Sequence, residues 1–178
     1  MSKNEFSANW FLEDRHVILI TETITSAMAA SIIMQLEYCH DAGVVPELWI
    51  CSPGGEVDAG MAIHNTMRNL PFVKTVAIGN CSSMAALLLA AGTKGKRCAY
   101  STVDIMIHQP LGGCQGQASD MERQWEHMKS TKRRLNTLLA KYSGQSVKKI
   151  EHDTDRDYYM TAEKALEYGI IDEIIHLE

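Results

Sequence analysis

Serine, histidine and aspartate residues that could perform hydrolysis occur at three separate places in the chain. Ser83 lies in the turn GNCSSM, between a β-like run and a helix-like run of small and apolar residues. A serine there is either a helix N-cap or a nucleophile with an exposed hydroxyl. If Ser83 is a nucleophile, the N–H of Met84 would be one of the unpaired donors at the start of the helix, and it could face the oxyanion that develops on the attacked carbonyl. The motif is not G-x-S-x-G, which argues against an α/β-hydrolase.

A second loop with available backbone donors is SPGG (52–55), which directly follows the β-like run ELWIC (47–51). Paired glycines allow backbone conformations that are closed to other residues, so the N–H of Gly55 can turn outward as a second oxyanion donor. An ordinary tight turn is the alternative interpretation of the same four residues.

The candidate base is His108, which lies in the apolar run IMIHQP while the other histidines lie in polar segments. It is either a core residue or the base for Ser83, because an imidazole titrates near neutral pH. The segment DTDRD supplies three carboxylates, and any of them can fix the tautomer of a catalytic histidine. They are Asp153, Asp155 and Asp157.

The elements around these residues alternate between strands and helices in the first half of the chain. β-like runs at 16–20, 47–51 and 73–78 are separated by helix-like runs at 26–41 and 58–69. This order predicts βαβ units, with a parallel sheet covered on both faces and a site at the C-terminal ends of its strands. Short strands at 97–100 and 104–109, a helix from Thr161 to Gly169 and a strand at 170–175 complete the prediction.

A long helix is predicted over residues 118–142, where apolar residues recur at spacings of three, four and seven. Lys132 interrupts this narrow apolar stripe, and the opposite face is charged. Such a helix either projects and packs against a partner subunit or lies flat on its own core. The chain contains no internal repeat or linker, so residues 1–178 are expected to form a single domain.

Composition excludes several functional classes. The formal net charge of −5 argues against a nucleic-acid partner, which calls for clustered Lys and Arg. The longest apolar run, residues 84–91, is too short to span a membrane. The five cysteines are scattered without a metal-binding or disulfide pattern, so no metal and no cofactor are expected. Together with the lack of a signal-peptide pattern, this predicts a cytoplasmic protein.

Six motifs occur in the order found in the proteolytic subunit of the caseinolytic (Clp) protease: SPGG, GNCSSM, MIHQPLGG, QGQASD, DTDRD and AxEYGIID. The chain resembles that family over about residues 11–175. The resemblance implies an α/β fold of the crotonase-like type, a ββα superhelix. Residues 118–142 would form its projecting handle helix, which interdigitates between two stacked heptameric rings, and residues 1–10 are expected to be flexible.

The same resemblance assigns roles to individual residues. Ser83 would be the nucleophile, His108 its base and Asp157 the third member of the triad. The amides of Gly55 and Met84 would form the oxyanion hole, and Asp155 and Arg156 would form an ion pair between rings. The implied activity is that of a serine-type endopeptidase that cleaves peptides or unfolded polypeptides inside a tetradecamer, into which an ATP-driven AAA+ unfoldase feeds its substrates.

Docking to an ordinary unfoldase is expected to be poor. Glu47, Asn69 and Cys98 occupy positions where the family usually has aromatic residues around the docking groove. In addition, only about ten residues precede the first matching segment. The other functions considered are a crotonase-type acyl-CoA enzyme, a non-catalytic ring subunit paired with an active paralogue, and a specialised relative such as a virus-encoded one.

Overall fold

The structure is a computed structural model that describes residues 15–177, so the predicted flexibility of residues 1–10 lies outside the described residues. Strands and helices alternate through the first half, and two short helices and two short strands follow the long helix. In chain order the elements are β1 (Val17–Ile20), α2 (Ser26–Asp41), β2 (Glu47–Ser52), α3 (Val57–Asn69), β3 (Lys74–Ser82), α4 (Met84–Ala90), β4 (Arg97–Tyr100), β5 (Ile105–Ile107), α5 (Ala118–Ser143), α6 (Val147–Asp153), β6 (Tyr158–Met160), α7 (Ala162–Tyr168) and β7 (Glu173–Ile175).

The sheet is mostly parallel, in the order β1-β2-β3-β4-β7. β3 pairs with β4 through residues 75–77 and then leaves it to pair with β5 through Cys81 and Ser82. β6 pairs antiparallel with β5. The C-terminal end of β3 therefore lies beside β5, which brings the segments around Ser83 and His108 together. The mixed α/β class expected from the sequence is confirmed.

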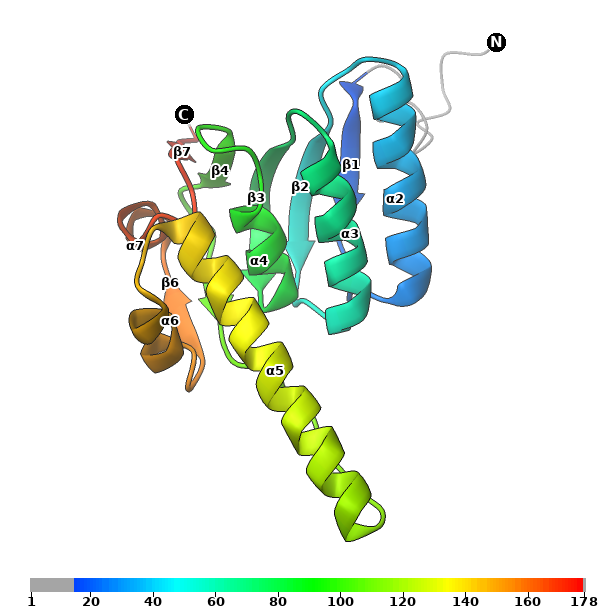
Figure 1. The fold of residues 1–178 in the computed structure, drawn as a ribbon. Coiled ribbons are helices and arrows are strands. Elements are labelled where there is room, and N and C mark those ends of the chain that lie inside the picture. Colours follow the sequence, from blue (N-terminus) through cyan, green and yellow to red (C-terminus); the bar gives the residue numbers. More distant parts are fainter. Residues whose placement is uncertain (1–14, 178) are drawn as a thin grey trace.

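Helices α2, α3 and α4 pack on one face of the sheet (Figure 1). Crossovers between sequential parallel strands have one hand, so helices that connect neighbouring strands in chain order gather on the same side. In β2 the residues of one face are therefore buried and those of the other face are only partly buried. The buried residues are Leu48, Ile50 and Ser52, and the partly buried ones are Glu47, Trp49 and Cys51. The prediction that the strands are covered on both faces is therefore wrong for β2.

The long helix α5 projects away from the sheet and from the helices that cover it (Figure 1). Its buried residues all lie in its C-terminal half, namely Leu135, Asn136, Leu139 and Ala140. In the projecting half Trp125 is 55% exposed. Gly144 ends the helix in a left-handed conformation. The projecting handle helix expected from the family resemblance is thus present, and a helix lying flat along its whole length is excluded.

Two elements were not predicted, α6 and β6, and one strand is longer than expected. α6 has seven residues, with the Ser146 side chain accepting a hydrogen bond from Lys149 N as its N-cap, and β6 has three residues. β3 continues to Ser82, and along it Gly79 leaves room for the side chain of Cys51. A Cβ at Gly79 would lie 2.5 Å from the Sγ of Cys51. Within residues 15–177, no helix is long and apolar enough to cross a membrane.

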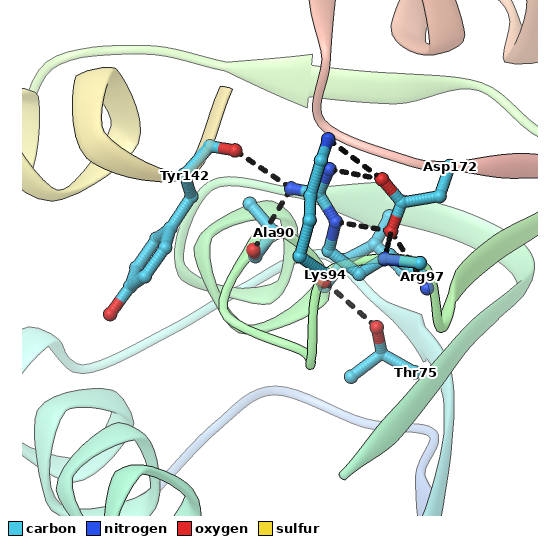
Figure 2. A network of polar contacts seen from close by, with 8 residues as sticks. Thr75, Ala90, Lys94, Arg97, Tyr142 and Asp172 are labelled. Carbon is cyan, nitrogen blue, oxygen red and sulfur yellow. Dashed lines mark hydrogen bonds and ion pairs between the residues drawn. The ribbon is translucent and has the colours of Figure 1, made fainter. Parts of the chain in front are cut away.

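A buried arginine joins the C-terminal strand region to the ends of two helices (Figure 2). The side chain of Arg97 is 1% exposed and donates from Nε and Nη2 to the two carboxylate oxygens of Asp172, at 2.8 and 2.6 Å. Its Nη1 donates to the carbonyls of Ala90 and Tyr142 near the ends of α4 and α5. Burial alone would raise the pKa of Asp172, but hydrogen bonds from Arg97 and Lys94 hold it well below its usual range.

Candidate active site

Ser83 occupies the junction between β3 and α4 in a strained backbone conformation. Its φ is 58° and its ψ is −124°, a combination that residues with a side chain rarely adopt. Although it stands at the N-cap position of α4, its side chain makes no capping hydrogen bond. Its Oγ lies 2.8 Å from the Nε2 of His108. Its hydroxyl therefore faces a histidine and does not cap the helix.

His108 follows β5 directly and is positioned by the pairing of β5 with β3. The backbone N–H of Ser83 donates to the carbonyl of Met106 at 2.8 Å, so the two strand ends are locked side by side. The side chain of His108 is 14% exposed, and its Nδ1 lies 3.3 Å from Oδ1 of Asp157, which is 55% exposed. The structure thus brings Ser83, His108 and Asp157 together in one row.

The other two carboxylates of the DTDRD segment point elsewhere. Asp153 accepts hydrogen bonds from Lys149 at 2.6 Å and from the hydroxyl of Tyr168 at 2.7 Å. Burial would raise the pKa of Asp153, but these two donors outweigh it and hold that pKa below the usual value. Asp155 and Arg156 are both exposed, and the only hydrogen bond from the Arg156 guanidinium within residues 15–177 goes to the backbone carbonyl of Asp155.

Gly54 and Gly55 shape the loop that faces Ser83. Gly54 has a φ of 92°, and a Cβ there would lie 2.6 Å from the Cβ of Ser83. At Gly55 a Cβ would lie 2.2 Å from the carbonyl oxygen of Ile24, whose N–H and C=O bond to Gly54 O and Glu56 N at 2.8 Å each. Only glycine fits this close approach.

The two backbone donors expected to form an oxyanion hole are both free. Neither the N–H of Gly55 nor that of Met84 has a hydrogen-bond acceptor among residues 15–177. A methyl group added at Gly54 would lie 3.0 Å from the Met84 nitrogen, so the glycine loop and the start of α4 are adjacent. Such paired free amides beside a nucleophile can stabilise a tetrahedral oxyanion.

A small apolar pocket opens beside Ser83. It has a volume of about 30 Å³, and its apolar lining comes from three helices and a loop, including Val57, Leu87, Pro110, Leu135 and Leu139. A groove of about 440 Å³ shares Val57 and Pro110 with it and runs between the 110–113 loop and the projecting half of α5. The sequence reasoning did not assign these lining residues, although the apolar stripe of α5 included Leu135 and Leu139.

One further histidine is buried, contrary to the expectation that all histidines except His108 lie in polar surroundings. His64 is 5% exposed, and its Nε2 lies 2.6 Å from the hydroxyl of Tyr142. Burial lowers the pKa of His64. It lies on α3 and takes no part in the row of Ser83, His108 and Asp157. In the described part of the chain, no three His, Cys, Asp or Glu side chains gather as metal ligands.

The mixed α/β fold, with its mostly parallel sheet and projecting helix, is consistent with the crotonase-like fold. Comparison with protein families defines the class further. The sequence model of the Clp protease family matches residues 3–178, nearly the whole chain. The protein therefore belongs to the Clp protease family, and it is a Clp-type peptidase.

Proposed function

We propose that the protein is a serine-type endopeptidase with Ser83 as nucleophile, His108 as general base and Asp157 as the carboxylate that orients His108. The observation that carries the proposal is the hydrogen bond of 2.8 Å between Ser83 Oγ and His108 Nε2. A serine at a helix start ordinarily uses its hydroxyl as a cap, whereas this hydroxyl faces a histidine instead.

Acylation follows from this arrangement. With its proton on Nδ1, facing Asp157, His108 accepts the Ser83 proton at Nε2 as the serine oxygen attacks the peptide carbonyl carbon. The carbonyl oxygen becomes an oxyanion that receives hydrogen bonds from Gly55 and Met84, each worth roughly 3 kcal/mol of transition-state stabilisation. His108 then gives its proton to the leaving amine, and water hydrolyses the acyl-serine by the same steps in reverse order.

The shape of the site supports an extended polypeptide substrate. The groove of about 440 Å³ leads away from the Ser83 pocket along the 110–113 loop. The residues of this loop belong to no strand, so their backbone groups can pair with an extended chain. A folded protein cannot lie in such a groove, and we therefore assign unfolded polypeptides and peptides as substrates.

The test is covalent labelling. The full chain is treated with a fluorophosphonate, and its intact mass is measured alongside the Ser83→Ala variant. We expect one adduct per wild-type chain, none on the variant, and peptide hydrolysis lost in parallel with labelling. A wild-type chain that takes no label but binds acyl-CoA saturably would identify a crotonase-type enzyme instead. A chain that does neither would be a non-catalytic ring subunit.

We further propose that the chain assembles into heptameric rings, stacked as a tetradecamer, in which Asp155 and Arg156 form an inter-ring ion pair. Support comes from large exposed apolar side chains and from charged side chains without an ion-pair partner. Met34 and Leu111 are 67% and 82% exposed, and neither Asp155 nor Arg156 forms a side-chain ion pair within residues 15–177. Large exposed apolar side chains commonly mark protein interfaces. A native mass of a single chain would contradict this proposal.

An AAA+ unfoldase would bind such a particle weakly. Glu47 accepts a hydrogen bond from Trp49 and pairs with Lys74, and Cys98 is buried, so neither offers an aromatic surface. We expect hydrolysis of small peptides but slow degradation of a tagged folded substrate with a generic unfoldase. A normal ATP-dependent rate would refute this expectation.

Because all five cysteines are free thiols, we place the protein in the cytoplasm.

A further inference from the structure

Gln109, the residue after His108, makes three hydrogen bonds, and two of them go to the segment that carries Asp157. Its backbone N–H donates to the carbonyl of Thr154 at 2.7 Å. Its side-chain Nε2 donates to the carbonyl of Asp155 at 2.8 Å. Its side-chain Oε1 accepts a hydrogen bond from the Nζ of Lys132 at 2.8 Å. Gln109 therefore connects the end of β5, the 154–157 segment and the helix α5.

Asp157 needs such support because little else holds it. Its carboxylate is 55% exposed, and its contact with His108 is its only hydrogen bond or ion pair within residues 15–177. The separation of 3.3 Å is longer than the roughly 2.7–2.9 Å of a strong charge-assisted hydrogen bond. Small movements of the 154–157 backbone therefore decide whether this carboxylate faces His108.

Lys132 and Asn136 lie four residues apart on α5 and thus on the same face of the helix. Asn136 is 1% exposed, and its side chain lies 3.4 Å from Oγ1 of Thr154. The Thr154 hydroxyl uses its single hydrogen in a bond to Ile150 O at 2.7 Å. In the structure Oδ1 of Asn136 faces this hydroxyl and the buried Nδ2 has no partner. Turning the amide by 180° would let Nδ2 donate to Thr154 Oγ1 instead. One face of α5 thus reaches the 154–155 segment directly through Asn136 and indirectly through Lys132 and Gln109.

We propose that Gln109 and Lys132 are positioning residues that hold the Asp157 segment against His108. The two polar groups of the Gln109 amide make different hydrogen bonds. The oxygen accepts from the Lys132 ammonium group, and the NH₂ group donates to the Asp155 carbonyl. A cation bound to an amide oxygen polarises the amide and strengthens the N–H donor. This explains why a lysine interrupts the apolar stripe of α5. The assignment rests on the proposed serine-peptidase function.

The test compares four variants of the full chain with a matched control. Gln109→Met removes both side-chain bonds, and Gln109→Glu keeps an acceptor for Lys132 but loses the donor to Asp155. Lys132→Met removes the cation, and Lys132→Arg keeps it. The control, Lys129→Met, makes the same charge change one turn earlier on α5, where Lys129 pairs with the exposed Glu126.

We expect Gln109→Met, Gln109→Glu and Lys132→Met to lower kcat for a small peptide by roughly tenfold to a hundredfold, since a misplacement of about 1 Å in a catalytic group costs on that order. KM and Tm should stay close to wild type, because the peptide groove and the core are untouched. Lys132→Arg should restore most of kcat, and Lys129→Met should not change it. The Gln109→Met/Lys132→Met double variant should be no slower than Gln109→Met alone.

Each outcome separates the positioning role from the proposed function. If the wild type reacts with fluorophosphonate and Gln109→Met has the same kcat, the positioning role is wrong and the peptidase assignment stands. If Lys132→Met and Lys129→Met lose equal activity, the effect is one of general charge, which also overturns the positioning role. A wild type that neither labels nor hydrolyses peptide overturns both. Should Gln109→Met fail to fold, the Lys132 series carries the same comparison.

Discussion

Replacement of Gly54 by alanine tests whether the glycine loop sets the position of the nucleophile. A methyl group added at this residue would lie 2.6 Å from the Cβ of Ser83, 2.7 Å from the carbonyl oxygen of Ser82 and 3.0 Å from the nitrogen of Met84. Two of these three atoms belong to the backbone, which cannot rotate away as a flexible side-chain end would. The nucleophile and one oxyanion donor are therefore displaced together.

The size of the effect follows from these distances. Ordinary contacts of a Cβ begin near 3.4 Å, so the gap of 2.6 Å to Ser83 has to open by about 0.8 Å. A misplacement of about 1 Å in a reacting group lowers rates on the order of a hundredfold, or about 2.7 kcal/mol in activation free energy. We therefore expect kcat of Gly54→Ala to fall about a hundredfold, with a similar fall in the rate of fluorophosphonate labelling of Ser83.

The matched control is Gly43→Ala. Gly43 has a φ of 68°, comparable to the 92° of Gly54, but a methyl group there meets nothing within 4 Å. Both variants carry the cost of placing alanine in a left-handed conformation, about 1 kcal/mol of stability, and only Gly54→Ala carries the clash. Both are compared by peptide hydrolysis, labelling rate and Tm. Wild-type kcat in folded Gly54→Ala would refute the reasoning.

Three further predictions concern stability and assembly. Arg97→Met should lower the free energy of unfolding by about 3–5 kcal/mol and Tm by roughly 10 °C, because Asp172 loses its two-point partner and the carbonyls of Ala90 and Tyr142 lose their buried donor; an unchanged melting curve would contradict this. Burial lowers the pKa of His64 below its unfolded value near 6.5, so the unfolded chain binds more protons in acid. The Tm should therefore fall as the pH drops below about 6.5, and less steeply in His64→Gln; equal slopes would rule out this role. Arg156→Ala should lose ring stacking and peptidase activity together, measured by native mass and hydrolysis, and full activity in single chains would disprove the link between assembly and the placement of Asp157.

Local sequence predicted the regular elements well. The helix over 26–41 has the predicted bounds, and the helix at 118–142 extends one residue further, to Ser143. Thr161 and Gly169 cap α7 as their residue types require. These helices can be predicted because they either contain several helical turns, over which apolar residues recur periodically, or have specific capping residues at both ends. α6 and β6, with seven and three residues, are shorter than a reliable period and were missed.

The proposed triad shows what local sequence could not decide. The residue types alone made Ser83 a cap or a nucleophile, and His108 a core residue or a base, without deciding between them. Three carboxylates in one short segment have the same local chemistry. The family resemblance singled out Asp157, but it gives no physical reason why Asp153 or Asp155 should not be the carboxylate that orients His108. The folded chain supplies that reason, since Asp153 is held by Lys149 and Tyr168.

The sequence by itself therefore determined the element order, the set of groups able to perform hydrolysis and, through its ordered motifs, the family. The tertiary structure alone decided which of those groups meet. β3 leaves β4 to pair with β5, and this switch places Ser83 and His108 within 2.8 Å although they are 25 residues apart. Such contacts depend on strand pairing between distant segments, which no local pattern encodes.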